Sequence, residues 1–301
     1  EISECLVGSE MCIRDSYKGN HNWIQVTNTP GIKTGWIYRP QLVKGFNPKG
    51  YQITHRRFLQ PTYAGDYYHV TSATKNAYLW DWTHTKKRLN LKNYTNQNLY
   101  RSNSVQISHN GKTSWYYYVG VPKKGQTIYG YVPSSAVTAG KTTNHSGRNL
   151  LFPDDFVSTK DYVHYLNDSK YQKLARSMVK LFPNTPVDLG LSRIAAYNYA
   201  TNDTWDEDAP EAISTKGYTK IVPFTSVATY LMNHKTQTNT QKLAAIKKLL
   251  AKQGYPQSKR TKLSDYKLGV YVINNVMGGR TNEDGSVHKG SWYGLIIGQK
   301  D

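Results

Sequence analysis

The residues of this sequence with the clearest chemical potential are flat aromatic rings that lie close to cationic side chains. Lysine and arginine can contact phosphate oxygens, and aromatic rings can pack against the apolar faces of sugars. A polymer that offers both phosphates and sugars therefore suits this combination. The alternative is that the aromatic rings form a β-sheet core and the lysines are solvated. The residues expected to bind such a polymer are Trp80, Trp82, Lys86, Lys87, Arg88, Tyr94, Tyr116, Lys123 and Lys124.

The positive charge is concentrated in the first half of the chain. The 301 residues contain 39 Lys and Arg against 20 Asp and Glu, a formal net charge of +19. Residues 17–150 hold 18 of these cations and two acids, a balance of +16, whereas residues 151–301 have a balance of +6. A local charge of this size attracts polyanions. Because no nucleic-acid-binding motif accompanies it, the sequence favours a polyanion other than nucleic acid.

Candidates for catalysis lie in two polar loops of the second half. The acidic loop 202–208 could hold a cation, or its Glu207 could act as a general acid in glycan cleavage. The loop 280–288 also combines charged groups between two predicted strands, with the candidate site residues Glu283, Asp284 and His288. Both segments also fit solvated loops, and the Asp-Gly pair in the second is first of all a turn signal.

Several enzyme classes are disfavoured by the residues that the sequence lacks. Its two cysteines both lie in the first sixteen residues, so the rest of the chain offers no thiol nucleophile. The histidines of the second half are widely separated and lack zinc-ligand spacing. We therefore expect no metal, no cofactor and no recognisable catalytic motif. No apolar run approaches the ~20 residues of a transmembrane helix.

Residues 1–16, with the sequence EISECLVGSEMCIRDS, resemble the translation of a sequencing adapter. The codons of a transposase-based library adapter encode the string that covers residues 6–16. We therefore expect segment 1–16 to be non-native and the natural gene to be truncated at its 5′ end. A signal peptide would have been lost with the missing part.

Short alternating strands with Gly, Asn and Pro turns are predicted for the first half. Segments 17–46 and 50–140 share an aromatic strand, a Gly/Lys turn and a Gly-aromatic-aliphatic strand, with GWI at 35–37 and GYV at 130–132. Segment 17–46 is interpreted as the surviving end of a cut module, and segment 50–140 as a complete one. Strands are expected near 67–71, 77–82, 98–100, 104–108, 114–119 and 129–132.

A linker over 141–152 and an α+β unit over 153–301 are predicted for the rest of the chain. Helical periodicity, an Asp168 N-cap and a Gly254 C-cap predict helices over 169–182, 223–234 and 240–253. Buried strands joined by a polar turn are predicted over 267–274 and 292–297. This pattern predicts a helical layer packed on a late hairpin or small sheet.

Both basic segments resemble bacterial SH3-like cell-wall modules of the GW type. The resemblance is carried by TSWYYYV at 113–119 with the GYV that follows, and by the GWI of the first segment. AYLWDWTHTKK at 77–87 and NLKNY at 90–94 are similar to the version in lactobacillal surface proteins. About 120 residues are covered. The second copy has Gly-Tyr where the family has Gly-Trp. The fold tolerates this replacement, but the resemblance then does not define which residues contact the ligand.

The resemblance implies a multidomain protein in which all-β SH3-like barrel modules precede the α+β unit. We expect a secreted surface protein that attaches non-covalently to the Gram-positive cell wall. Its basic modules would bind teichoic or lipoteichoic acid and peptidoglycan and would display a C-terminal unit whose role the sequence does not give. One alternative is a peptidoglycan hydrolase or carboxypeptidase with its catalytic unit in 151–301. A second alternative is an adhesin that binds a host.

Overall fold

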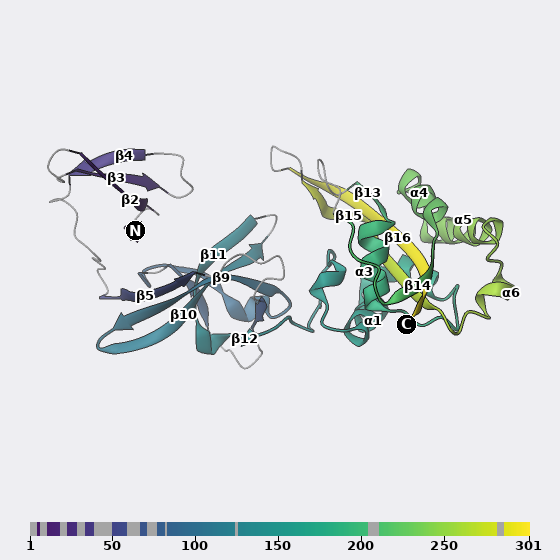
Figure 1. Cartoon of the computed structure of the whole chain (residues 1–301), viewed down its shortest axis with the longest axis horizontal. Coiled ribbons are helices and arrows are strands. Elements are labelled where there is room, and N and C mark those ends of the chain that lie inside the picture. Colours follow the sequence, from purple (N-terminus) through teal and green to yellow (C-terminus); the bar gives the residue numbers. More distant parts are fainter. Residues whose placement is uncertain are drawn as a thin grey trace.

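The computed structural model describes residues 5–6, 11–18, 23–28, 34–38, 50–58, 67–70, 77–81, 83–123, 126–203, 211–281 and 286–301. Within these ranges the protein is mostly β structure in antiparallel sheets, and α-helices occur in the second half (Figure 1). The helices in this described part of the chain are too short or too polar to cross a membrane.

An N-terminal sheet has four strands in sequential order: β1 Cys5–Leu6, β2 Met11–Lys18, β3 Trp23–Asn28 and β4 Thr34–Tyr38. The strand β1 and most of β2 fall inside residues 1–16. Strand pairing uses the backbone groups that nearly every residue carries. The pairing therefore does not bear on the origin of this segment, and its assignment to an adapter stays a prediction.

A central sheet runs in the order β12-β6-β9-β10-β11-β7-β8, and β5 pairs with β9. Its strands are β5 Gln52–Phe58, β6 Tyr67–His69, β7 Tyr78–Trp80, β8 Lys87–Asn90, β9 Asn98–His109, β10 Lys112–Lys123, β11 Gln126–Pro133 and β12 Thr138–Ala139. Short 3-10 turns lie at Leu91–Tyr94 and Ser134–Ala136. The described pairings form an open path, so closure into a barrel stays a prediction.

The predicted strands of this region agree with the central sheet. Strands expected near 67–71, 77–82, 114–119 and 129–132 correspond to β6, β7, β10 and β11, while two expected strands merge into the single strand β9. Both copies of the predicted repeat contain an antiparallel hairpin whose second strand carries the Gly-aromatic-aliphatic tripeptide. Val26 pairs with Gly35 in the first copy, and Val119 pairs with Gly130 in the second.

Gly130 allows β7 to lie directly against β11. A Cβ atom at this position would lie 2.7 Å from Leu79 Cγ and 2.7 Å from the backbone oxygen of Trp80, closer than real contacts allow. The next residue, Tyr131, is buried and pairs with Trp80 across the two strands. The Gly-Tyr dipeptide therefore fixes the position of Trp80 on the sheet.

The second half contains a four-stranded sheet in which β16 pairs with β13, β14 and β15. Its strands are β13 Thr201–Asn202, β14 Tyr218–Pro223, β15 Lys267–Thr281 and β16 Val287–Lys300. Its helices are α1 Thr159–Asp168, α2 Lys173–Val179, α3 Leu189–Asn198, α4 Thr225–Asn233, α5 Asn239–Lys252 and α6 Gln257–Arg260. Short 3-10 turns lie at Pro153–Asp155 and Lys170–Gln172.

The late hairpin and two of the three predicted helices are confirmed as β15–β16, α4 and α5. Gly254 follows α5 with a φ of +81°, the left-handed conformation of a helix C-cap. The helix expected over 169–182 is shorter, and Asp168 does not cap it. The Ser169 side chain instead accepts a hydrogen bond from Tyr171 N at the preceding 3-10 turn. Helices α1 and α3 were not predicted.

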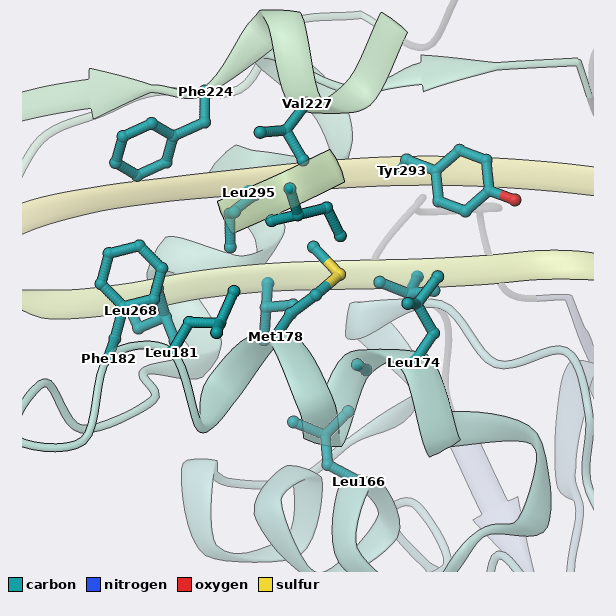
Figure 2. Close-up of a cluster of buried hydrophobic side chains, with 14 of the residues drawn as sticks. Leu166, Leu174, Met178, Leu181, Phe182, Phe224, Val227, Leu268, Tyr293 and Leu295 are labelled. Atoms are coloured by element: carbon teal, nitrogen blue, oxygen red, sulfur yellow. The ribbon is translucent and has the colours of Figure 1, made fainter. Parts of the chain in front are cut away.

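Alternate residues of the β15–β16 hairpin belong to different cores. Leu268 and Leu295 lie in the large core that α1, α2, α4 and α5 share. Figure 2 shows side chains of α2 and α4, such as Met178 and Val227, pointing toward these two strands. Another set of hairpin residues packs against α3, where Ile296 contacts the helix. The hairpin therefore carries apolar layers on both faces.

The segment 141–152 is hydrogen-bonded to both halves of the chain. Thr142 N donates to Asn98 Oδ1, and Asn98 Nδ2 donates to Asp155 Oδ1 at 3.2 Å. His145 is buried, and its Nε2 lies 3.1 Å from both carboxylate oxygens of Asp161 in α1. Polar composition predicted a linker here, and the structure adds that its polar groups are paired across the junction.

Glycines let α3 approach the hairpin closely. A Cβ atom on Gly294 would collide with the backbone oxygen of Ala195, and its nearest contacts are backbone atoms that cannot rotate away. At Gly298, on the same strand, the nearest atoms are side-chain carbons of Ile221 and Leu191 at 3.3 Å. The helix therefore depends on the missing side chain at position 294.

Replacing Gly294 by alanine should lower the free energy of unfolding by about 1–3 kcal/mol, because overpacking of a filled core costs that much. Urea denaturation followed by far-UV circular dichroism measures the change. Gly298→Ala is the matched control on the same strand and should cost less than about 1 kcal/mol. Equal losses in the two variants would show that the Ala195 contact does not determine the packing.

Candidate functional site

Four aromatic side chains from separate segments of the central sheet form one continuous stack. The ring of His109 lies on Tyr51 with centroids 3.9 Å apart and planes 6° apart. Tyr51 lies in turn on His84 at 4.1 Å and 10°, and Trp80 continues the row 5.3 Å from His84. We call His109, Tyr51, His84 and Trp80 the aromatic stack. Tyr116 meets the His84 ring edge-on at 5.1 Å.

A groove of about 300 Å³ opens beside the aromatic stack. It is lined by Tyr51, Ile107, His109, Asn110, Lys112, Ser114 and Tyr116. Burial raises the pKa of Tyr116, with a further contribution from Tyr51, so the hydroxyl stays protonated and can donate a hydrogen bond. Flat rings, an ammonium group and neutral polar groups thus line the same groove.

The turn after β7 holds His84 in the aromatic stack. Asp81 Oδ1 accepts hydrogen bonds from the backbone N of Thr85 at 2.8 Å and of Lys86 at 3.0 Å, while Oδ2 accepts from two threonine hydroxyls. Burial raises the pKa of Asp81, but these hydrogen bonds outweigh it and lower the pKa below its usual value. The bonds offset the left-handed φ of +53° at His84, which costs a non-glycine residue roughly 1–2 kcal/mol.

The structure brings three of the predicted polymer-binding residues together. Trp80 and Tyr116 contact His84, as described above. The ammonium of Lys87 lies over the rings of Tyr78 and Trp80, at 4.2 and 5.5 Å from their centroids. Such cation–π contacts keep the ammonium near the rings while leaving it exposed.

The neighbouring cations Lys86 and Arg88 are also exposed. The ammonium of Lys86 takes no part in the turn, whose contact is made by its backbone N. Arg88 Nη1 donates to the backbone oxygen of Tyr129 at 2.7 Å, which directs the guanidinium toward β11. Lys86, Lys87 and Arg88 follow one another in the chain, and the ammonium of Lys87 lies over the Trp80 ring at the end of the aromatic stack.

The remaining predicted polymer-binding residues lie apart or outside the described ranges. Tyr94 is half-buried and packs against the core of the central sheet. Lys123 pairs with Gln126, five residues along β11 from Tyr131, which is roughly 17 Å at about 3.4 Å per residue. Trp82 and Lys124 fall outside the described residues.

The candidate catalytic residues are placed only in part. Glu207, Glu283 and Asp284 lie outside the described residues. His288 is exposed on β16, and its Nε2 lies 3.1 Å from Ser286 Oγ. Across the described ranges, no three or more His, Cys, Asp or Glu side chains gather in a way that could hold a metal ion.

The sequence did not reveal Tyr51, His84, His109 or Lys112 as members of the site. The pairing of β5 with β9 brings the first and third of these together, and that pairing joins distant segments. The sequence DWTHT has no regular period, so it gave only a partial signal that Asp81 organises a turn and that His84 has a positive φ. Comparisons with family models, with curated proteins and with solved structures found no match to this chain.

Another polar cluster is buried between α5 and the β15–β16 hairpin. Lys242 Nζ donates to Asn274 Oδ1 at 2.6 Å and to the backbone oxygen of Lys235 at 2.8 Å. The hydroxyl of Tyr293 donates to the same Asn274 oxygen at 2.7 Å. Lys242 has no carboxylate partner among the described residues, and burial lowers its pKa to about 8. The cluster joins α5 to the hairpin and makes this lysine sensitive to pH.

Lys242 should make the free energy of unfolding rise between about pH 8 and pH 10. The folded protein loses this proton near pH 8, whereas the unfolded chain keeps it until about pH 10.4, so the unfolded chain binds more protons in the window. Lys242→Met removes the titration and should flatten the rise. Urea unfolding across this pH range measures it, and Lys247→Met, exposed on the same helix, should leave the slope unchanged. The same rise in Lys242→Met and wild type would contradict the assignment.

Proposed function

We propose that this chain attaches non-covalently to the Gram-positive cell wall by binding an anionic wall polymer, teichoic or lipoteichoic acid. The groove beside the aromatic stack carries the proposal, because Tyr51, His109, Tyr116 and Lys112 line the same space. Phosphates of the polymer would pair with Lys112, and its sugar or polyol carbons would pack on the rings. In this proposal the central sheet is an SH3-like module of the GW type within a secreted, multidomain surface protein.

A repeating polymer suits the site better than a small ligand does. Lys86, Lys87 and Arg88 add exposed positive charge in the same sheet, and the ammonium of Lys87 lies over the Trp80 ring at the end of the aromatic stack. A chain of regularly spaced phosphates could contact the groove and these cations at once. The overall balance of +16 over residues 17–150 adds a long-range attraction that steers such a polyanion to the sheet.

The two alternatives gain no support from the described residues. A peptidoglycan hydrolase would need a catalytic constellation in 151–301, and the only described candidate, His288, is exposed with a serine neighbour. For a host-binding adhesin, no observation on the described residues points to a host ligand. Wall attachment is therefore the single function that we propose.

The full chain should co-sediment with purified lactobacillal walls at low salt and remain in the supernatant after teichoic acid has been extracted from them. Raising the salt from about 0.1 M to 1 M shortens the Debye length from ~10 Å to ~3 Å, so most of the bound protein should be released. Sedimentation that is unchanged by salt or by extraction would exclude attachment through an anionic polymer.

Lys112→Gln should weaken wall binding about two- to fivefold, because one partly exposed contact between charges is worth about 0.5–1 kcal/mol. Lys92→Gln is the matched control, since it removes the same charge from an exposed position of the same region outside the groove. Dissociation constants from sedimentation at fixed salt compare the two variants. If both weaken binding equally, net charge rather than the groove determines affinity.

A further inference from the structure

The second half of the chain has a face on which acidic residues are missing. Segments 170–187 and 239–264 contain eleven Lys and Arg, of which Lys242 and Arg260 are buried, and no Asp or Glu. These segments form α2, α5 and α6, and α2 packs against α5. The net charge of +6 over residues 151–301 therefore hides an uneven distribution, because these segments are strongly basic and the acids lie in the rest of this half.

A pocket of about 270 Å³ opens on this basic face, between the end of α2, the middle of α5 and α6. Three of its lining residues are the cations Lys180, Lys247 and Arg260, and no carboxylate lines it. Leu181 and Leu243 supply an apolar part of the wall. The pocket therefore combines a triply positive lining with apolar surface.

Arg260 is held in place at this pocket and is only 4% exposed. Its Nε donates to the backbone oxygen of Tyr255 at 3.1 Å, its Nη1 donates to that of Leu181, and the guanidinium lies 5.7 Å from the ring of Phe182. These contacts use two of the five N–H donors of a guanidinium. Within the described ranges no carboxylate lies at ion-pair distance from Arg260.

A buried charge without an opposite charge is costly, and burial lowers the pKa of Arg260 accordingly. An anion in the pocket would supply the missing charge. The two backbone oxygens and the Phe182 ring already fix the guanidinium, so little side-chain entropy would be lost when a ligand binds. The fork of N–H groups suits a phosphate, and the lysine ammonium groups can complete the contacts to it.

We propose that this pocket binds a phosphate group of a polyol-phosphate chain. The phosphate oxygens would accept hydrogen bonds from Arg260, Lys180 and Lys247, and the polyol carbons would pack on Leu181 and Leu243. The assignment to a wall polymer rests on the proposed function, whereas the phosphate pocket itself does not. The second half would then hold the same polymer at another point, and two linked contacts bind more tightly than either alone.

Isothermal titration calorimetry of the full chain with glycerol phosphate tests the pocket. Lys180→Gln/Lys247→Gln removes two of its cations while leaving Arg260, whose loss could disturb folding. Lys173→Gln/Lys248→Gln is the matched control, because it removes two exposed cations of the same helical segments outside the pocket. The pocket pair should raise the dissociation constant about tenfold and the control pair less than about twofold. Equal effects of the two pairs would overturn the proposal.

Further titrations distinguish the sources of the phosphate. Purified lipoteichoic acid should show the same pocket dependence as glycerol phosphate. If phosphatidylglycerol vesicles bind through the pocket and lipoteichoic acid does not, the polymer assignment is overturned in favour of a membrane headgroup.

The groove variant Lys112→Gln separates this inference from the proposed function. The pocket pair should weaken glycerol phosphate binding by the same factor in the Lys112→Gln background as in the wild type, because position 112 lies outside the pocket. If Lys112→Gln leaves wall binding unchanged while the pocket pair loses binding, the proposed groove is wrong and the phosphate pocket stands. The reverse result overturns the pocket alone.

Discussion

The close approach of β7 to β11 at Gly130 is the contact that fixes the Trp80 end of the aromatic stack. Because no side chain separates the strands there, Trp80 is fixed opposite Tyr131 and the following turn begins at a defined point. Asp81 then organises that turn and inserts His84 between two aromatic rings. The places of Trp80 and His84 in the stack follow from where this strand lies, whereas Tyr51, His109 and the groove that they line depend on the pairing of β5, β9 and β10. Gly130 therefore determines the position of two of the four stacked rings without contributing a side chain.

Local patterns predicted only some of the elements, and the site depends on long-range pairing. Helices α4 and α5 and the late hairpin have clear periods and end signals, so the sequence was sufficient for them. Helix α3 lies against the glycines of the hairpin and is apolar on most sides. It therefore lacks the one-sided apolar stripe by which the sequence of a surface helix is recognised. Tyr51 and His109 meet only through the pairing of β5 with β9. No local period reports such a contact, and the same holds for the Arg260 pocket, which joins three separate segments.

Lys242 and Arg260, the buried cations among the described residues of the second half, accommodate their charges in opposite ways. Lys242 is enclosed, and its ammonium is satisfied by an amide oxygen and a backbone oxygen, so its proton is held weakly. Arg260 cannot release its proton near neutral pH, and it lies at the wall of a pocket rather than in a closed core. A titratable amine can be accommodated by neutral partners, whereas a permanent charge requires either solvent or an anion. This difference distinguishes a structural cluster from the pocket that we propose as a phosphate site.

The hydrogen-bonded segment 141–152 also has a mechanical consequence. A protein held to a surface by its central sheet and pulled from its C-terminal half transmits the load through this junction. The load passes from Asn98 to Thr142 and Asp155, and from His145 to Asp161. Several hydrogen bonds that are loaded in parallel share the force. A flexible linker without such bonds would first extend, and the force would then act on its backbone alone. Under the proposed attachment, shear at the surface would load these paired contacts as well as the connecting chain.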